Sequence, residues 1–370
     1  MQRRRVLSWQ ALLWGAVLLY GAAFAHVTAL AGDEAPPRPH VAALLPLESP
    51  AFGRLADAVR RGLEAAASAA VDEDEAHPPA LPLVVVPVAD DGAAVVQAYR
   101  KAVAAGARFV VGPLARNAVR ALAASGAVNV PTLALSLPET DTALPEGMMA
   151  FGVSLEAEAR QVARLAASQG RRRAAIVAAD SPLSRRASQA FGEAFAAEGG
   201  EVVARQPFAG ERPRLKAVRE ALAAARADAV FFALDGPRIR QMRPFLDRSL
   251  PGYATSQAHS GDSAVVGQLD LAGIVFVDMP WLVAPEHPAV APYWRPPSPG
   301  AGFDQERFFA MGLDAWQLAS QFLAAPAGTP VVLDGASGQL AAGDGGLIRR
   351  SALPAQFTAT GVRPLPEATH

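Results

Sequence analysis

The sequence predicts an α/β protein with two Rossmann-like lobes, each built on a parallel sheet and joined to the other by crossovers of the chain. Three observations support this fold class. Apolar, strand-like runs alternate with amphipathic helices from residue 40 onward, and the pattern restarts near residue 154. The chain has 370 residues, enough for two hydrophobic cores. Hydrophobic residues make up 51% of it and charged residues 19%, as expected of a folded globular protein.

The first half of the folded region, residues 38–152, shows the strand–helix repeat clearly. A fully apolar run opens it, typical of a strand buried on both faces. Leu55, Val59 and Leu63 then recur at helical spacing. Gly112-Pro113 ends a later strand. The expected strands are 41–45, 83–88, 109–111, 130–135 and 149–153, and the helices after the first are 93–105 and 117–124.

The second half repeats the pattern, which predicts a second parallel sheet with helices on both faces. A helix over residues 155–168 leads into a strand over 174–179. The pattern continues with helices over 183–198, 215–225 and 238–246, and with strands over 201–205, 229–234, 252–255 and 274–277.

The chain after Trp281 has a different pattern. A proline-rich loop over residues 285–299 precedes a strong helix over 305–323. Asp-Gly pairs between short apolar runs then indicate hairpins. The expected strands are 331–333, 338–340 and 347–351.

These patterns predict the domain organisation. The first lobe is expected to combine residues 38–152 with 283–333. The second lobe is expected to combine residues 153–282 with 334–361. Residues 362–370 are expected to form a frayed tail.

The first 31 residues form a separate segment. Three arginines at 3–5 precede an apolar run over residues 11–25, and small residues suitable for cleavage follow. This is the layout of a secretory signal peptide. An uncleaved membrane anchor is the alternative, because residues 11–31 are almost long enough to span a bilayer. We therefore expect export, with residues 32–37 as a tether, and no lipid anchor because the chain has no cysteine.

Charge and motif searches exclude several classes of protein. The formal net charge of −1 gives no basic footprint for nucleic acid. No nucleophile elbow, zinc-protease motif or phosphate loop occurs, and no two of the six histidines have metal-ligand spacing. A loop with Ser256, His259, Ser260 and Asp262 invites comparison with a catalytic triad, but such a local cluster favours turn chemistry. We therefore expect no enzyme activity, no metal and no cofactor.

Two charged stretches leave alternatives open. Residues 71–79 contain four acids and a histidine, which is compatible with a divalent-cation loop, but a solvated loop is favoured because calcium-loop spacing is missing. Arg171–Arg173 are compatible with binding of an anionic polymer. A solvated turn beside a helix C-terminus is the favoured interpretation of these arginines.

Several motifs resemble known proteins. Residues 42–47 (AALLPL), 111–114 (VGPL) and 334–340 (DGASGQL) are similar to elements of the type I periplasmic binding-protein fold. The stretches YATSQAHSG, LDLAGIVFVDMPWLV, RFFAMGLDAWQLA and GGLIRRSALPAQFTATG resemble the LppC-type family of penicillin-binding-protein activators. The likeness covers about residues 38–361.

The resemblance implies a periplasmic, non-catalytic regulator that binds and stimulates a bifunctional penicillin-binding synthase. The alternative is a solute-binding receptor that closes on an amino acid or a similar small molecule. The best-known family members are lipoproteins that carry a helical repeat domain ahead of this fold. This sequence contains no cysteine to carry the lipid, and we expect no such repeat domain ahead of the fold.

The family motifs single out five residues. Asp278 is expected at the carboxyl rim of a strand, with Pro280 ending the strand ladder. Trp281 offers a large face at the crossover, and packing between the lobes is favoured over stacking on a ligand. Gly312 is expected to allow close helix packing, and Asp314 to cap a neighbouring loop.

A small-molecule cleft, if used, would lie at the carboxyl ends of the strands. Amino-acid receptors of this fold hold the ligand carboxylate with hydroxyls, but the corresponding loops here carry Ala115 and Ala134. An unpaired carboxylate in a closed cleft is costly, so the missing hydroxyls favour the regulator. The remaining rim candidates are Ser49, Ser136, Asp180, Asp235 and Asp278.

Overall fold

The computed structural model describes residues 37–72, 81–138, 142–260, 269–293, 302–325, 329 and 331–366. The predicted leader, most of the tether, residues 73–79 of the acidic stretch and Asp262 lie outside these ranges. From Pro39 onward the chain forms one unit. Among the described helices, none is long and apolar enough to cross a membrane.

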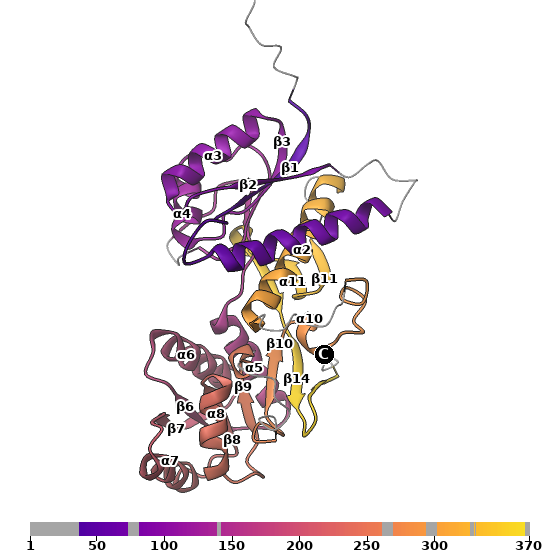
Figure 1. Ribbon diagram of the computed structural model, residues 1–370. Coiled ribbons are helices and arrows are strands. Elements are labelled where there is room, and N and C mark those ends of the chain that lie inside the picture. The colour runs from indigo at the N-terminus through magenta and orange to yellow at the C-terminus, as the bar shows by residue number, and fades with distance from the viewer. Residues whose placement is uncertain are drawn as a thin grey trace, which may run out of the picture. The chain divides into compact units, whose positions relative to one another are not determined.

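The first sheet is parallel and five-stranded, in the order β2-β1-β3-β4-β5. Its strands are β1 (His40–Leu45), β2 (Leu83–Pro87), β3 (Ala107–Val111), β4 (Thr132–Ala134) and β5 (Met148–Ala150). The helices between them are α2 (Gly53–Asp72), α3 (Gly92–Ala104) and α4 (Arg116–Ala124). Alternate residues of β1 enter opposite cores because successive strand side chains point to opposite faces: Val41 packs with α2, and Ala42 packs with α3 and α4. Figure 1 shows α3 and α4 on one side of this sheet and α2 on the other.

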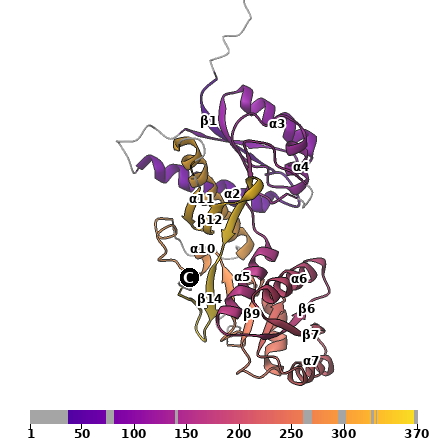
Figure 2. The same cartoon turned by 180° about the vertical axis from the view of Figure 1, so that it is seen from behind.

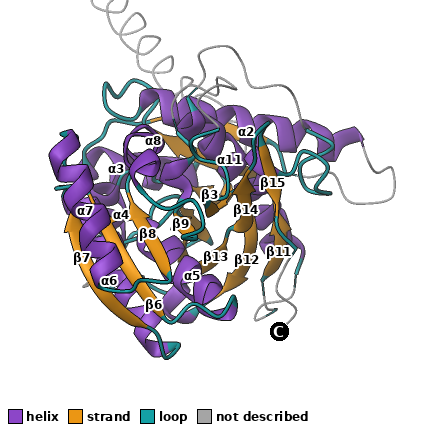
Figure 3. Cartoon of the chain, turned by 90° about the horizontal axis from the view of Figure 1, so that it is seen from below, coloured by secondary structure: helices purple, strands orange, loops and turns teal. Residues whose placement is uncertain are grey.

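The second sheet has seven strands in the order β15-β14-β10-β9-β8-β6-β7. Figure 3 shows β7, β6, β8 and β9 of this sheet side by side. Its strands are β6 (Arg173–Ala178), β7 (Glu201–Pro207), β8 (Ala229–Ala233), β9 (Gly252–Ala254), β10 (Val275–Asp278), β14 (Leu353–Phe357) and β15 (Val362–Pro364). Only β14 and β15 run antiparallel to their neighbours. Helices α5 (Leu155–Ser168) and α6 (Pro182–Ala197) cover one face, and α7 (Arg212–Ala224) and α8 (Gly236–Met242) cover the other.

A third, antiparallel sheet completes the first lobe. It contains β11 (Val332–Gly335), β12 (Gly338–Ala342) and β13 (Ile348–Ser351), which follow the helices α10 (Pro280–Val283) and α11 (Phe303–Ala324). Short 3-10 turns occupy Arg243–Phe245, Ser256–Ala258 and Asp344–Gly346. Leu340 and Ile348 are buried in the core that also holds α2 and α11. In both Figures 1 and 2, α11 lies beside α2.

Two expected boundaries differ from the structure. The expectation placed residues 334–361 in the second lobe, but residues 334–351 pack on the first because the alternating apolar side chains of β12 and β13 complete its core. Only the residues from Leu353 onward join the second sheet. Residues 362–364, expected in a frayed tail, form β15 and pair with β14.

The two long helices of the first lobe touch backbone to backbone. A Cβ placed on Gly312 of α11 would lie 2.3 Å from the carbonyl oxygen of Val59, and one on Gly62 of α2 would lie 2.1 Å from that of Phe309. Real Cβ atoms do not approach so closely, so only glycine fits either position. The close packing predicted for Gly312 is confirmed.

Candidate functional site at the lobe crossover

Asp278 ends β10 and is completely buried. Its Oδ1 accepts hydrogen bonds from the backbone N–H of Met279 (2.8 Å) and from Nε of Arg307 (3.0 Å), and its Oδ2 accepts one from Nη2 of Arg307 (2.8 Å). Asp278 belongs to the second sheet and Arg307 to α11 of the first lobe. The bidentate pair therefore joins the two lobes where the chain crosses between them.

The Asp278–Arg307 pair holds both groups charged. Burial by itself raises the pKa of the Asp278 carboxyl, but the Arg307 charge and the hydrogen bonds from His259 and Arg307 hold this pKa well below its usual range. Burial likewise lowers the pKa of Arg307, but Asp278 more than compensates and raises it. Arg307 also donates to the carbonyl oxygens of Ser256 (2.9 Å) and His259 (3.0 Å).

His259 belongs to this ion-pair cluster. Its Nδ1 lies 2.9 Å from Oδ2 of Asp278, and its ring packs against Phe276, Phe303 and Phe357. Within the described chain, no hydrogen bond joins His259 to the hydroxyl of Ser256 or Ser260. Among the described residues, His259 is thus bonded to Asp278 and not to a serine hydroxyl of its own loop. The favoured interpretation, plain turn chemistry, missed the long-range bond of His259 to Asp278.

A second buried ion pair crosses between the lobes. Glu158 of α5 accepts a hydrogen bond from Nη2 of Arg350 on β13, and both side chains are almost fully buried. The other oxygen of Glu158 accepts the backbone N–H of Ser256 (3.1 Å). Because the Ser256 carbonyl accepts from Arg307, the two ion pairs form one continuous polar network.

The network continues into the third sheet through Asp314. This buried carboxylate of α11 accepts the backbone N–H groups of Ala336 (2.7 Å) and Ser337 (2.7 Å) and the Ser337 hydroxyl. Arg350 donates to the Ser337 carbonyl oxygen at 3.0 Å. Asp314 thus caps the turn between β11 and β12, as the sequence predicts.

Asp314 gives the protein a pH dependence of its own. Burial raises the pKa of its carboxyl to about 6, against the opposing hydrogen bonds from Ser337 and Ala336. In the unfolded chain, the pKa of this aspartate is near 4. The contribution of the protonated Asp314 carboxyl to stability is therefore fully present below about pH 4 and is lost as pH rises through about 6. Asp314→Asn removes the titrating group. Between pH 4 and 7, we therefore expect wild type to lose up to about 3 kcal/mol of unfolding free energy relative to this variant. Urea titrations across this range measure the difference, and a flat difference contradicts it.

Trp281 is buried in the first-lobe core rather than exposed to a cleft. Its indole N–H donates to Oε2 of Glu306 at 2.8 Å, and its ring lies 4.9 Å from that of Phe309. Its backbone N–H donates to the Ala336 carbonyl oxygen. Pro280 starts α10 directly before it and is also buried. Both residues therefore shape the crossover that leads from β10 to α10.

The structure does not bring the predicted cleft residues together. Ser49 caps the start of α2 by accepting the Phe52 N–H at 2.9 Å, and it donates to Asp90. Asp235 caps α8 through the N–H of Arg238. Asp180 is 94% exposed and pairs with an arginine five residues later. Ser136 is half-buried near Gly152. With Asp278 bound to Arg307, four of the five candidates are engaged in internal bonds.

A groove of about 930 Å³ draws its walls from both lobes, yet none of the five candidates lines it. Its first-lobe side includes Arg116, at the start of α4, and its second-lobe side includes Glu156, Arg160 and Arg186. Glu156 and Arg186 form an ion pair of 2.6 Å. Arg116 and Arg160 make no hydrogen bond or ion pair among the described residues. The groove therefore contains two guanidinium groups that are unengaged among the described residues.

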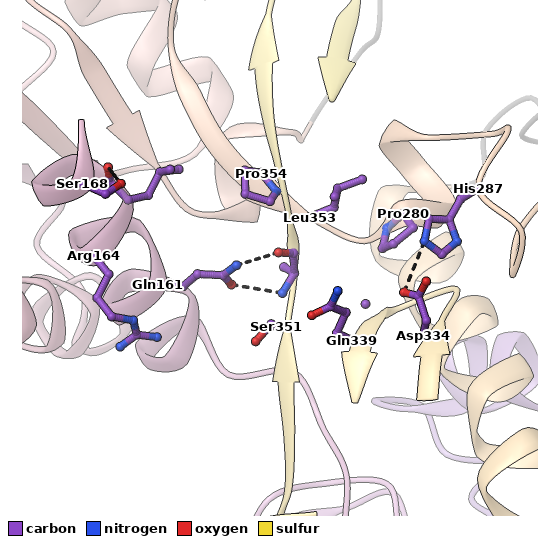
Figure 4. A pocket seen from close by; sticks show the side chains of 13 residues that line it. Gln161, Arg164, Ser168, Pro280, His287, Asp334, Gln339, Ser351, Leu353 and Pro354 are labelled. Atoms are coloured by element: carbon purple, nitrogen blue, oxygen red, sulfur yellow. Dashed lines mark hydrogen bonds and ion pairs between the residues drawn. The ribbon is translucent and has the colours of Figure 1, made fainter. Parts of the chain in front are cut away.

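A smaller pocket, of about 310 Å³, lies beside the crossover from β13 to β14 (Figure 4). The side-chain amide of Gln161, on α5, forms two hydrogen bonds with the backbone of the crossover, one through its nitrogen and one through its oxygen. Its Nε2 donates to the Ala352 carbonyl oxygen (2.6 Å), and its Oε1 accepts the Ala352 N–H (3.0 Å). Across the pocket, His287 and Asp334 lie 3.4 Å apart. The single residue that separates β13 from β14 is thus fixed to the second lobe.

The network residues Glu158, Arg307 and Arg350 were missed as site residues, although two of them carried a signal. Glu158 lies four residues before Val162, on the apolar stripe of its helix, where a charge needs a partner. Arg307 is likewise buried on α11 with Ala310 and Met311. A charged residue within an apolar stripe is therefore the sequence signal for this network.

The arginine run 171–173 is largely engaged within the second lobe. The backbone N–H groups of Arg172 and Arg173 donate to the Asp228 carboxylate, at 2.9 and 3.0 Å. The Arg172 side chain donates to the Ala167 carbonyl oxygen at the end of α5. These bonds match the favoured interpretation of a turn beside a helix C-terminus.

Two lobes with parallel sheets, three crossovers and a buried network between them define a protein with the type I periplasmic binding-protein-like fold. The chain belongs to the LppC family: the family described as "LppC putative lipoprotein" matches residues 16–360. This confirms the resemblance that the motifs suggested.

The comparisons with individual proteins include curated relatives and solved structures. "Penicillin-binding protein activator LpoA" of Edwardsiella piscicida is 29% identical over 288 residues, which cover 66% of this chain and 41% of that protein. The chain thus spans less than half of this curated relative. The "LpoA (YraM) C-domain from Haemophilus influenzae, a regulator of PBP1A" covers 88% of this chain and all of its own, with a TM-score of 0.71 and 20% identity.

A third comparison has a different description. A structure from Chromobacterium violaceum, titled "a putative branched-chain amino acid ABC transporter", is 36% identical. It covers 86% of this chain and 100% of its own, with a TM-score of 0.75. The fold is therefore shared by proteins described as regulators and as transporters, and the fold does not choose between these functions.

Proposed function

We propose that this protein is a non-catalytic periplasmic regulator that binds a bifunctional penicillin-binding synthase and stimulates it. The observation that carries the proposal is the state of the polar groups at the strand ends. Ser49, Asp235 and Asp278 are already bonded within the protein, and Ala115 and Ala134 supply no hydroxyl. The names of the curated LppC-family relatives, penicillin-binding protein activators, support the same function.

The buried network supports a regulator for a second reason. Two ion pairs, Asp278–Arg307 and Glu158–Arg350, connect the lobes at the crossovers. Separating either pair would leave a buried charge without its partner, which costs several kcal/mol. A rearrangement of the lobes that separated these pairs would therefore be expensive. A regulator that presents a fixed surface does not need such a rearrangement.

A receptor for a small anionic solute is the second candidate. The groove of about 930 Å³ favours it, because Arg116 and Arg160 are unengaged there among the described residues. Helix α4 also starts at Arg116 without a side-chain cap. Free N–H groups at a helix start attract an anion. The transporter description of the Chromobacterium violaceum structure supports this candidate.

One experiment separates the two candidates. The purified protein is added to a bifunctional penicillin-binding synthase in a glycan-polymerisation assay, and a panel of amino acids is titrated into the protein by calorimetry. We expect a severalfold increase in the polymerisation rate, no turnover by the protein alone and no heat of amino-acid binding.

Arg116→Ala is the matched control variant. It should leave the stimulation of the synthase unchanged, since Arg116 lies in the groove that the regulator does not use for a solute. Tight binding of one amino acid that is lost in Arg116→Ala, together with no effect on the synthase, would instead establish the receptor.

A further inference from the structure

The net charge of −1 includes a net negative charge on one lobe and a net positive charge on the other. The sequence ranges 39–152 and 280–351, whose described residues build the first lobe, contain 12 lysines and arginines against 18 aspartates and glutamates. Residues 153–279 and 352–366, which build the second lobe, contain 18 against 14. The second lobe is therefore basic overall, and the first is acidic.

The positive charge of the second lobe is concentrated on one face of its sheet. Helix α7 exposes four cations within eight residues: Arg212, Arg214, Lys216 and Arg219. The neighbouring segment from α8 to residue 250 adds Arg240 and Arg248. Leu215 of α7 and Met242 of α8 pack in the same core, so both helices cover one face of the second sheet.

The six cationic side chains of this α7–α8 face have no partner among the described residues. None of their guanidinium or ammonium groups makes a hydrogen bond or ion pair with any described residue, although the backbone carbonyl of Arg248 accepts from Arg243. By contrast, Arg185 and Arg186 of α6, on the other face of the sheet, pair with Asp180 and Glu156, at 2.6 Å each. Unpaired cations clustered on one face create a positive potential, which attracts acidic partners and speeds their encounter.

We propose that the α7–α8 face is the docking surface for an acidic protein surface. The identity of that protein rests on the proposed function: the acidic surface belongs to the synthase. Exposed cations of this kind contribute mainly to the rate of association and to specificity. Their effect weakens as salt shortens the screening length. Binding should therefore fall steeply with ionic strength.

The test reverses charges on α7 and, as a control, on the first lobe. The test variant is Arg212→Glu, Arg214→Glu and Arg219→Glu. The control is Arg100→Glu, Lys101→Glu and Arg108→Glu, which makes the same change in net charge at exposed, unpaired positions of the other lobe. At 50 mM salt, we expect the test variant to weaken the Kd for the synthase by about tenfold or more and the control by less than about threefold. Circular dichroism and Tm check that both variants fold.

A second arm makes the surface testable without the synthase. Poly-L-glutamate should bind wild type and the control variant at low salt but not the α7 variant. If poly-L-glutamate gives this result but wild type does not bind the synthase, the proposed function is wrong, whereas the α7–α8 face remains supported as a docking surface for acidic partners. Equal loss in both variants, or binding insensitive to salt, would overturn the proposal. Stronger α7-dependent capture by phosphatidylglycerol vesicles than by poly-L-glutamate would overturn its assignment to a protein.

Discussion

Replacing Arg307 with methionine should lower the free energy of unfolding by about 3–5 kcal/mol at pH 7. The methionine keeps much of the packing volume on α11 but removes the charge that Asp278 faces. Asp278 is completely buried, and its two oxygens would lose bonds of 3.0 and 2.8 Å. A buried carboxylate without its partner is far more costly than the intact pair. Urea unfolding at pH 7 measures the loss.

The pH dependence of the Arg307→Met effect distinguishes a lost ion pair from lost packing. In wild type, Arg307 and His259 hold the pKa of Asp278 below its usual range. This stabilisation is therefore present above about pH 4 and is lost as pH falls. The variant can protonate Asp278, so its deficit should shrink toward pH 4. A deficit that does not depend on pH would refute the ion-pair explanation.

Two further variants complete the Arg307 experiment. Asp278→Asn combined with Arg307→Met removes both charges and should recover part of the single-variant loss, since the two residues are in direct contact. Arg100→Met removes an exposed arginine on α3 and should change stability by no more than about 0.5 kcal/mol.

Replacing Gly312 with alanine should destabilise the protein by about 3 kcal/mol, at the upper end of overpacking effects. The added Cβ would lie 2.3 Å from the carbonyl oxygen of Val59 and 3.0 Å from Cα of Gly62, and both are backbone atoms that no rotamer change can move. Helices α2 and α11 would have to separate, opening the core between them. Thermal unfolding monitored by circular dichroism measures the change.

Gly302→Ala is the matched control for Gly312→Ala. Gly302 directly precedes the same helix, and a Cβ there would meet no heavy atom within 4 Å. Its φ of −71° is also compatible with alanine. We expect this variant to stay within about 0.5 kcal/mol of wild type. Equal losses in the two variants would show that the helix contact is not the cause.

The elements were predictable where one pattern determined them. The strand expected over residues 41–45 is β1 from His40, because an apolar run buried on both faces leaves no other place for these residues. The cap role of Asp314 and the close contact of Gly312 also followed from local chemistry. These are properties of single residues within an element whose burial the sequence already indicates.

The lobe boundary and the ion pairs were not predictable in the same way. Which core receives the short strand with Leu340 depends on the position of α11, and no local pattern encodes that. Glu158 and Arg350 are 192 positions apart, so their pairing is a property of the folded chain. Ser49 and Asp235, predicted as cleft residues, cap helix starts instead, because a polar side chain at a strand end also suits a turn or a cap.

The late position of β14 and β15 in the chain affects how the second lobe folds. These strands come from residues 353–364, yet β14 pairs along all of β10, on the side of that strand opposite β9. During synthesis, the first strands of this sheet emerge long before their last partners. Until then, the outer edge of β10 has no strand to pair with, and such edges invite pairing with other chains. A delay in folding until residue 364 is available would therefore protect the chain from aggregation.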